Sequence, residues 1–340
     1  MTTRIAFLGD TLLGGSAQDV IDEEGYDYPL AGIKHFWADT DLVVANHEAP
    51  LTTRDEPAAK LDTGKKRYWY KGRPESAHAL HAHGVRVVSL ANNHVGDFSG
   101  DGVMDTMAAL DSARIAHCGA GASDAAARRP ITIEAGGLSV GFLSVMQRYQ
   151  MYVDEGVYAR RGNPGPAMLR RSRLQADIAQ LRQRVDLCVV LVHWGRNYKP
   201  LTSLQERMAS EIVEAGADLV IGHHPHIPHP VRIVQGVPVL FSLGNAAFGT
   251  PGRYHSGRPP YGLVAMVTAE SHRVVSLDLH LIHVDNAQVN FQPRPATDGD
   301  ARVQLEGMLS GLPPSVALSL DRHRAVARVG LTAGDMGARF

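Results

Sequence analysis

The chain has 340 residues, of which 44% are hydrophobic and 20% are charged, a composition that supports a well-formed core. Its formal net charge is −1, so it lacks the basic excess expected of a nucleic-acid-binding protein. The two cysteines, Cys118 and Cys188, match no zinc or redox spacing and indicate two buried thiols in a reducing compartment.

The N-terminal residues 1–4 lead directly into an apolar run, without the pattern of a signal peptide. No apolar run approaches the roughly 18–20 residues that a membrane helix needs. We therefore expect a cytoplasmic protein with no membrane partner.

Short runs rich in valine, isoleucine and leucine predict buried strands, and helical patterns lie between many of them. The predicted strands cover residues 5–8, 42–45, 85–90, 187–192, 219–221 and 237–241. The predicted helices cover residues 74–83, 102–112, 167–184 and 203–215. A hairpin is expected around Gly136-Gly137, and residues 262–284 predict further antiparallel strands. This alternation predicts an α/β fold.

Polar turns follow several of the predicted strands and hold many of the 17 histidines. Ligands bind beyond the carboxyl ends of strands in open α/β sheets, so these turns predict a shared site. The candidate residues in these turns are Asp10, Glu48, Asn93, His94, His193, His224 and His226.

Each turn also has a simpler structural interpretation. Asp10 could cap a helix, and Glu48 could be a solvated loop acid. Asparagine at position 93 is typical of an Asx turn, and an isolated histidine such as His193 is more often a structural hydrogen-bonding group. The His224-Pro225-His226 segment is balanced between a metal site and a histidine-rich surface loop, although its two imidazoles can point the same way when it is extended.

Together, these residues offer carboxylate, amide and imidazole groups, a mixture that suits a dication such as Mn, Fe or Zn. The set is larger than the three protein ligands typical of a single catalytic zinc. The sequence therefore predicts two divalent metal ions that serve hydrolysis or a related metal-assisted transfer.

The strings that carry these residues resemble, in order, the CapA family of poly-gamma-glutamate capsule biosynthesis proteins. The fold of that family is similar to that of calcineurin-like metallophosphatases. The resemblance covers roughly residues 4–250. Its main strings are Phe7-Leu8-Gly9-Asp10, Ala45-Asn46-His47-Glu48-Ala49-Pro50-Leu51-Thr52, Ser89-Leu90-Ala91-Asn92-Asn93-His94, His193-Trp194-Gly195, His224-Pro225-His226 and Phe241-Ser242-Leu243-Gly244-Asn245.

The resemblance implies a four-layer α/β/β/α sandwich with a two-metal centre at one edge. We expect a catalytic domain over residues 1–285 and a C-terminal extension over 286–340 that packs on it. By resemblance, Asp10 binds the first metal, Glu48 bridges both, Asn93 and His193 bind the second, and His224 and His226 complete the pair. His94 is then the general acid or transition-state donor, with Asn93 beside it.

The chain departs from the family pattern at three positions. Metallophosphatases usually have a histidine two residues after the first aspartate, and Leu12 at this position predicts a weak or rebuilt first metal site. His47 replaces the usual leucine before the glutamate, and is an extra ligand, a substrate contact or simply a loop residue. Arg196 follows His-Trp-Gly where the family often has a glutamate nearby, and it favours an anionic substrate group.

These features predict a hydrolase that attacks an anionic phosphoester or gamma-glutamyl amide with a metal-bridging hydroxide. Arg196, Lys65, Lys66 and Arg67 are expected to hold the anion, although each lysine alone is more typical of a solvated loop. Two alternatives stay open: a non-catalytic accessory protein that binds polyglutamate or an assembly partner, and a metal-dependent ligase or cyclase. Neither the metal nor the oligomeric state follows from the sequence.

Overall fold

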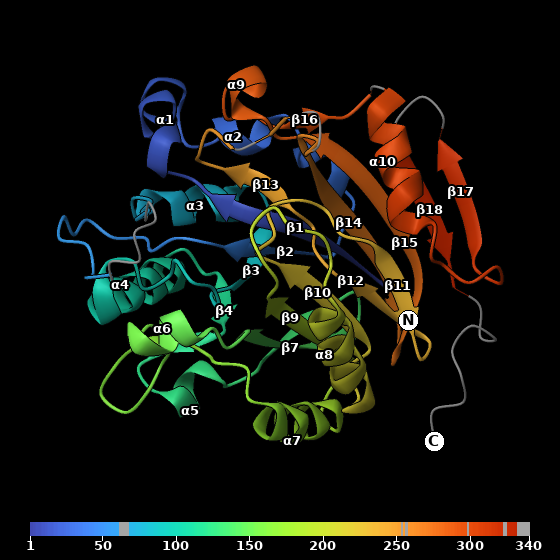
Figure 1. Cartoon of the computed structure of the whole chain (residues 1–340), viewed down its shortest axis with the longest axis horizontal. Helices are drawn as coiled ribbons and strands as arrows, with labels where there is room; N and C mark the ends of the chain where they lie inside the picture. The colour runs from blue at the N-terminus through green and yellow to red at the C-terminus, as the bar shows by residue number, and fades with distance from the viewer. Residues whose placement is uncertain (61–67, 253, 256–257, 298, 322–324, 332–340) are drawn as a thin grey trace.

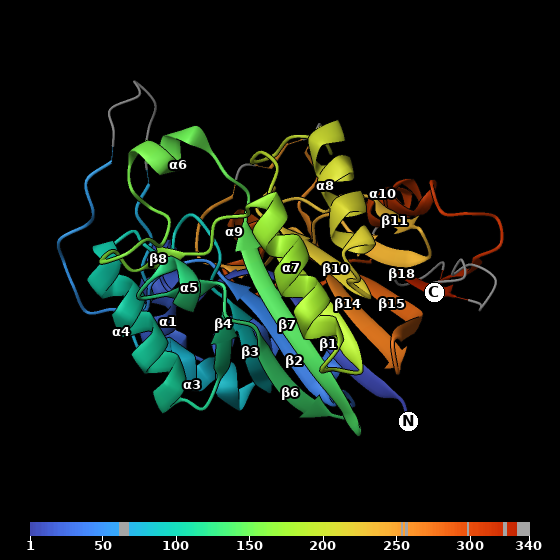
Figure 2. The same ribbon diagram turned by 90° about the horizontal axis from the view of Figure 1, so that it is seen from below.

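Two large β-sheets face each other in the computed structural model, with helices on their outer faces (Figures 1 and 2). The structure describes residues 1–60, 68–252, 254–255, 258–297, 299–321 and 325–331. The predicted α/β fold class is confirmed, since parallel strands and helices alternate along much of the chain.

The first sheet has ten strands within the described residues. Its parallel part consists of β1 (Thr3–Leu12), β2 (Leu42–His47), β3 (Val85–Ser89) and β4 (Ala116–Cys118). The antiparallel strands β14 (Tyr261–Glu270), β15 (Arg273–His283), β18 (Val326–Gly330) and β17 (Ala317–Asp321) continue it from β1. The short strands β13 (Asn245–Phe248) and β16 (Arg294–Pro295) pair with β1 and β15, respectively.

The second sheet is built around parallel strands that end on the same side. Its order is β11 (Val231–Val234), β12 (Val237–Leu240), β10 (Leu219–His223), β9 (Leu187–His193), β7 (Leu138–Met146) and β6 (Ile131–Ala135). The predicted hairpin joins β6 to β7. Gly136 and Gly137 have φ values of 56° and 81°, which a two-residue primed turn requires and glycine adopts without strain.

The helices connect these strands on the outside of the molecule (Figure 1). They are α1 (Gln18–Glu24), α2 (Tyr28–Ala31), α3 (Glu75–Ala82), α4 (Ser99–Ser112), α5 (Asp124–Ala127), α6 (Gln150–Asp154), α7 (Arg171–Arg182), α8 (Ser203–Glu214), α9 (Asn286–Val289) and α10 (Gly299–Leu309). The 3₁₀ turns η1 (Gly15–Ala17) and η2 (Lys34–Trp37) and the small β5 (Ala120–Gly121) and β8 (Gly165–Pro166) pair complete the described elements.

Three apolar clusters separate the layers. One cluster joins the facing sides of both sheets and includes Phe7 and Phe142. A second lies between the first sheet and helices α1 to α4, and a third between the second sheet and helices α7 and α8. The order of layers is therefore α, β, β, α, because each sheet is apolar on both faces and must be covered on both.

The C-terminal segment continues the first sheet. Strand β18 pairs with β15, and the apolar face of α10, which includes Leu305 and Met308, joins the cluster between the sheets. The division into domains at residue 285 stays a prediction. Among the described residues, no helix is long and apolar enough to cross a membrane.

A cavity in the apolar cluster between the sheets should lower the stability of the fold considerably. We expect Phe142→Ala to lower the free energy of unfolding by about 3–5 kcal/mol, because the buried ring leaves a void that rigid strands cannot close. Denaturant unfolding measures this change. Val303→Ala on the exposed face of α10 is the control and should change stability by less than about 0.5 kcal/mol; a similar small effect for Phe142→Ala would contradict the packing.

Candidate metal centre

The carboxyl ends of β1, β2, β9 and β10 bring polar side chains together at one edge of the space between the sheets. Asp10 lies opposite Asn46 on β2, whose amide donates a hydrogen bond of 2.8 Å to Asp10 Oδ1. His193 lies opposite His223 on β10, and each comes two residues after a side chain that packs between the sheets. Because alternate strand residues share a face, both imidazoles enter the same space.

Asp10 is fully buried and meets nitrogen atoms on both carboxylate oxygens. His223 Nδ1 lies 3.3 Å from Oδ1, and His226 Nδ1 lies 3.3 Å from Oδ2. The backbone N–H of His224 donates to Oδ2 at 3.3 Å. Burial acts to raise the pKa of Asp10, but the His223 and His226 imidazoles beside its two oxygens outweigh burial and hold the pKa well below its ordinary value. Asp10 is therefore a carboxylate.

Glu48 follows β2 directly and is also fully buried. Neither of its carboxylate oxygens has a hydrogen-bond partner within the described part of the chain. His193 Nε2 lies 3.5 Å from Glu48 Oε1, and His226 Nε2 lies 3.9 Å from it. Burial, together with the negative charges of Asp10 and Asp97, raises the pKa of Glu48 well above its ordinary value. A buried carboxylate without a cation is costly, so this position calls for positive charge.

The spacing of these groups is that of ligands around a shared ion. Two ligands that each lie about 2.0–2.2 Å from a tetrahedral zinc are about 3.3–3.6 Å from each other. The nitrogen–oxygen distances of 3.3 and 3.5 Å at Asp10 and Glu48 fall in this range. Among the residues that the structure describes, two groups of donor atoms are close enough to hold an ion: Glu48, His224 and His226, and Asp10, Glu48 and His193. Glu48 belongs to both groups, as a bridging carboxylate would.

Asn93 and His193 approach from opposite sheets. Asn93 follows β3, and its Oδ1 atom lies 2.8 Å from His193 Nε2. Burial, reinforced by the neighbouring His224, lowers the pKa of His193 well below its ordinary value. Burial likewise lowers the pKa of His224 to about 3. Neutral imidazoles have a free lone pair, which is the form that binds metal.

The backbone of the turn after β10 is strained. His224 has φ of 96° and His226 has φ of 59°, a region that non-glycine residues seldom adopt. This conformation brings His224 to 4.6 Å from His193, measured between ring centroids. Strain of this kind costs on the order of 1–3 kcal/mol per residue and persists where the surrounding structure holds it, often at functional sites.

His94 contacts Asp97 beside the centre. His94 Nδ1 lies 2.7 Å from Asp97 Oδ2, which leaves Nε2 as the nitrogen available to a reacting group. Asp97 also accepts hydrogen bonds from Lys60 Nζ at 2.6 Å and from the backbone N–H of Tyr70 at 2.8 Å. Burial lowers the pKa of His94, and Asp97 opposes this change.

The residues differ in depth. Asp10 and Glu48 are 0% exposed, whereas Asn93 is 6% and His94 is 9% exposed. His94 and Asn93 therefore lie nearer to solvent than the two carboxylates. Aromatic rings surround the centre. Measured between ring centroids, Tyr70 lies 4.3 Å from His94 and Tyr149 lies 5.6 Å from His224. Tyr198 and Phe248 lie 5.5 and 5.0 Å from His226.

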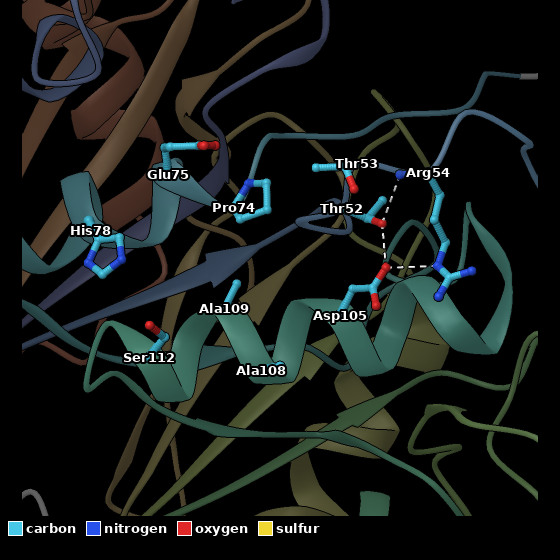
Figure 3. Close-up of a pocket in the computed structure, with 10 residues that line it drawn as sticks. All are labelled: Thr52, Thr53, Arg54, Pro74, Glu75, His78, Asp105, Ala108, Ala109 and Ser112. Carbon is cyan, nitrogen blue, oxygen red and sulfur yellow. Dashed lines mark hydrogen bonds and ion pairs between the residues drawn. The ribbon is translucent and has the colours of Figure 1, made fainter.

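A surface groove of about 590 Å³ lies between α3, α4 and residues 52–54 (Figure 3). Its polar groups bind each other: Asp105 accepts hydrogen bonds from the Thr52 hydroxyl at 2.6 Å and from Arg54 Nε at 2.8 Å. The groove holds none of the buried carboxylates. Its contacts instead anchor the start of the segment that carries Lys60 and Tyr70 to Asp97.

The predicted metal ligands and His94 therefore converge, whereas the predicted substrate-binding residues do not form one group. Arg196 is exposed, and its positive charge acts on Tyr149 at the rim. His47 is fully buried, and strand alternation directs it away from Asn46 and the space between the sheets, so its position gives no support to a substrate contact. Burial lowers the pKa of His47 to about 4. Lys65, Lys66 and Arg67 lie outside the described residues.

Sequence reasoning assigned no role to four residues that contact the centre: Asn46, Asp97, His223 and Asn245. Asn46 bonds Asp10, and Asn245 Oδ1 lies 2.9 Å from His226 Nδ1. Asn46 and Asn245 both lie in polar turns at strand ends, and Asp97 comes three residues after His94. Their positions in the sequence could therefore have identified these three residues as site candidates. His223 gave no separate signal beside two neighbouring histidines.

Comparison with known proteins identifies the family. The sequence model of one family, described as bacterial capsule synthesis protein PGA_cap, matches residues 4–250. The chain belongs to this family. The chain is similar to a Bacillus anthracis protein named capsule biosynthesis protein CapA, with 27% identity over 72% of this chain and 59% of that protein.

Two further relatives have names that also refer to polymer biosynthesis. The PGA biosynthesis protein CapA of Bacillus subtilis is 26% identical over 72% of this chain and 62% of its own length. A Mycobacterium tuberculosis protein named as a probable polyglutamine synthesis accessory protein is 30% identical over 76% of this chain and 70% of its own. The chain thus spans about six-tenths of the length of the Bacillus relatives.

Solved structures similar to this family member include the calcineurin-like phosphoesterase YfkN from Bacillus subtilis. It is 11% identical, has a TM-score of 0.42, and the match covers 79% of this chain and 86% of that one. A hypothetical protein from Thermus thermophilus is 20% identical, with a TM-score of 0.48 and coverage of 83% and 99%.

Glu48 provides a test of the centre that does not require a substrate. We expect metal-free Glu48→Gln protein to unfold at the same or a higher temperature than the parent, because the amide removes a buried charge. Added Mn²⁺ should stabilise the parent by about 2.7 kcal/mol at about 100 times its Kd, and the variant much less. Thermal unfolding with and without metal measures both effects.

Glu134→Gln on the exposed side of β6 is the matched control and should keep the full response to metal. A parent protein whose unfolding temperature is unchanged by Mn²⁺, Fe²⁺ and Zn²⁺ would contradict the metal centre.

Proposed function

We propose that this family member is a metal-dependent hydrolase with two metal ions, acting on an anionic substrate. The observation that supports this most is Glu48: a fully buried carboxylate without a hydrogen-bond partner among the described residues, shared by two groups of possible ligands. Carboxylate, amide and imidazole donors together suit Mn, Fe or Zn. Asp10, Glu48, Asn93, His193, His224 and His226 would hold the ions.

The bound ions would polarise the scissile group and lower the pKa of the attacking water. The chain itself supplies the remaining parts of the reaction. His94 would donate a proton from Nε2 to the leaving group, while Asp97 keeps the ring in place through Nδ1. Lys60 and the Tyr70 N–H hold Asp97, so the segment between β2 and α3 positions the acid indirectly.

The enclosing aromatic rings would exclude water from the reacting groups and strengthen electrostatic interactions there. Arg196 at the rim would bind the anionic group of the substrate, because a guanidinium can form two hydrogen bonds to a phosphate or carboxylate. The substrate is then a phosphoester, or an amide of an acidic amino acid such as a gamma-glutamyl unit. The second class agrees with the names of the relatives, which refer to PGA and polyglutamine synthesis.

Those names also favour a second candidate, a non-catalytic accessory protein that binds the polymer. One relative is named as an accessory protein. Full metal occupancy without turnover on either substrate class would support this candidate over the hydrolase. A metal-dependent ligase or cyclase is the remaining alternative, and no contact described above favours it.

Metal removal tests the hydrolase directly. We expect chelation to abolish turnover of a phosphodiester such as bis-p-nitrophenyl phosphate, of a gamma-glutamyl anilide, or of both, since His94 alone cannot activate water. Added Mn²⁺ or Zn²⁺ should restore the rate. Spectrophotometric assays on both substrates separate the two classes, and turnover that survives complete metal removal would refute the mechanism.

Arg196 tests the anionic substrate. We expect Arg196→Ala to raise KM by about 10-fold or more with a small change in kcat, because a charge-assisted hydrogen bond contributes about 1.5–3 kcal/mol to binding. Steady-state kinetics on the substrate that the parent hydrolyses measure this ratio. Arg207→Ala on the exposed face of α8 is the control, and equal KM values for all three proteins would show that Arg196 does not bind substrate.

A further inference from the structure

The strand that carries Asp10 supplies no imidazole to the first metal site. Leu12 stands two residues after Asp10 and packs against Ala49 and Phe248, with Tyr70 beside this cluster. Its side chain offers no ligand atom. Glu48 and His193 form one group of donor atoms with Asp10, so any further imidazole for a cation at Asp10 must come from another strand.

His223 is positioned to be this donor. It ends β10, is 2% exposed, and continues the face of the strand that packs between the sheets. Its Nδ1 atom lies 3.3 Å from Asp10 Oδ1, yet within the described structure this nitrogen has no hydrogen-bond partner of acceptable geometry. Two ligand atoms of one ion lie about 3.3–3.6 Å from each other. The distance between His223 Nδ1 and Asp10 Oδ1 falls in this range, so the two atoms are placed as ligands of the same ion would be.

The strained turn explains how two consecutive histidines serve one centre. Successive strand residues normally point to opposite faces, so His223 and His224 would diverge in a regular strand. The φ of 96° at His224 breaks this alternation. His223 can then face Asp10 while the His224 ring joins Glu48 and His226.

Asp10 has one hydrogen-bonded neighbour and two more distant imidazole neighbours. Asn46 Nδ2 lies 2.8 Å from Asp10 Oδ1 and makes an ordinary hydrogen bond. His223 and His226 stand further off, each at 3.3 Å, one beside each oxygen. The carboxylate is thus held by Asn46 and flanked by two imidazoles.

We propose that His223 is a direct ligand of the cation bound by Asp10, and that it replaces the histidine which Leu12 excludes. This inference rests on the proposed metal centre but assigns a ligand outside the family pattern. It makes the site at Asp10 a rebuilt one, with its imidazole supplied by the opposite sheet instead of by the same strand.

The test measures metal binding and needs no substrate. The full chain is stripped of metal and titrated with Mn²⁺ by equilibrium dialysis and calorimetry. We expect two ions per chain for the parent. His223→Asn should keep one ion at parental affinity and weaken the other by about 100-fold or more, beyond the roughly 10–100-fold typical of a residue that only orients a ligand.

His229→Asn is the matched control. His229 is a buried histidine of the same turn whose Nε2 contacts the backbone carbonyl of Lys199 at 2.9 Å, so its loss should leave both affinities unchanged. Circular dichroism establishes that both variants fold.

A second measurement on the parent protein covers the case in which His223→Asn does not fold. In protein labelled with ¹⁵N-histidine and loaded with ¹¹³Cd²⁺, a direct ligand shows scalar coupling between the cadmium and a ring nitrogen, whereas a histidine that only contacts Asp10 does not. We expect coupling at Nδ1 of His223.

The outcomes are distinguishable. Two ions bound by the parent, with unchanged affinities in His223→Asn or without cadmium coupling at His223, would overturn this inference and leave the proposed function intact. A parent that binds no ion would overturn both.

Discussion

The structure depends on two carboxylates, Asp10 and Glu48, that are fully buried between the sheets without a lysine or arginine partner among the residues described. Ionised groups in such a place are costly unless positive charge offsets them. Histidines surround both groups, and burial keeps His193 and His224 in the neutral form. Neutral donors around uncompensated anions make a site for cations, and the choice of donors favours borderline-hard ions.

The fold creates this site by facing the carboxyl ends of two separate sets of parallel strands toward each other. The first sheet contributes the carboxylates and Asn93, and the second contributes the imidazoles. The strained turn at His224 and His226 then directs further donors to the same point. Rigid, apolar layers on both sides hold the ligands in position, so the strain at the turn is carried by packing elsewhere.

Family membership and chemistry remain separate conclusions. The family is shown by the match over residues 4–250, but a shared fold does not determine a reaction. The features that bear on the reaction are local: the Asp97–His94 pair, the aromatic rings around the centre and the exposed Arg196. These favour proton transfer to a leaving group and an anionic substrate, and the kinetic and metal-binding behaviour of the chain decides between hydrolysis and binding alone.

The sequence by itself determined the α/β class, most strand positions and the polar turns, because apolar runs and the residues that follow them are local signals. Short elements such as β13 and β4 were not predicted, since their stability comes from neighbouring strands. Only the tertiary structure decided that Asn46 and His223 face Asp10 while His47 points away, because a side chain's face depends on register, bulges and the φ of single residues.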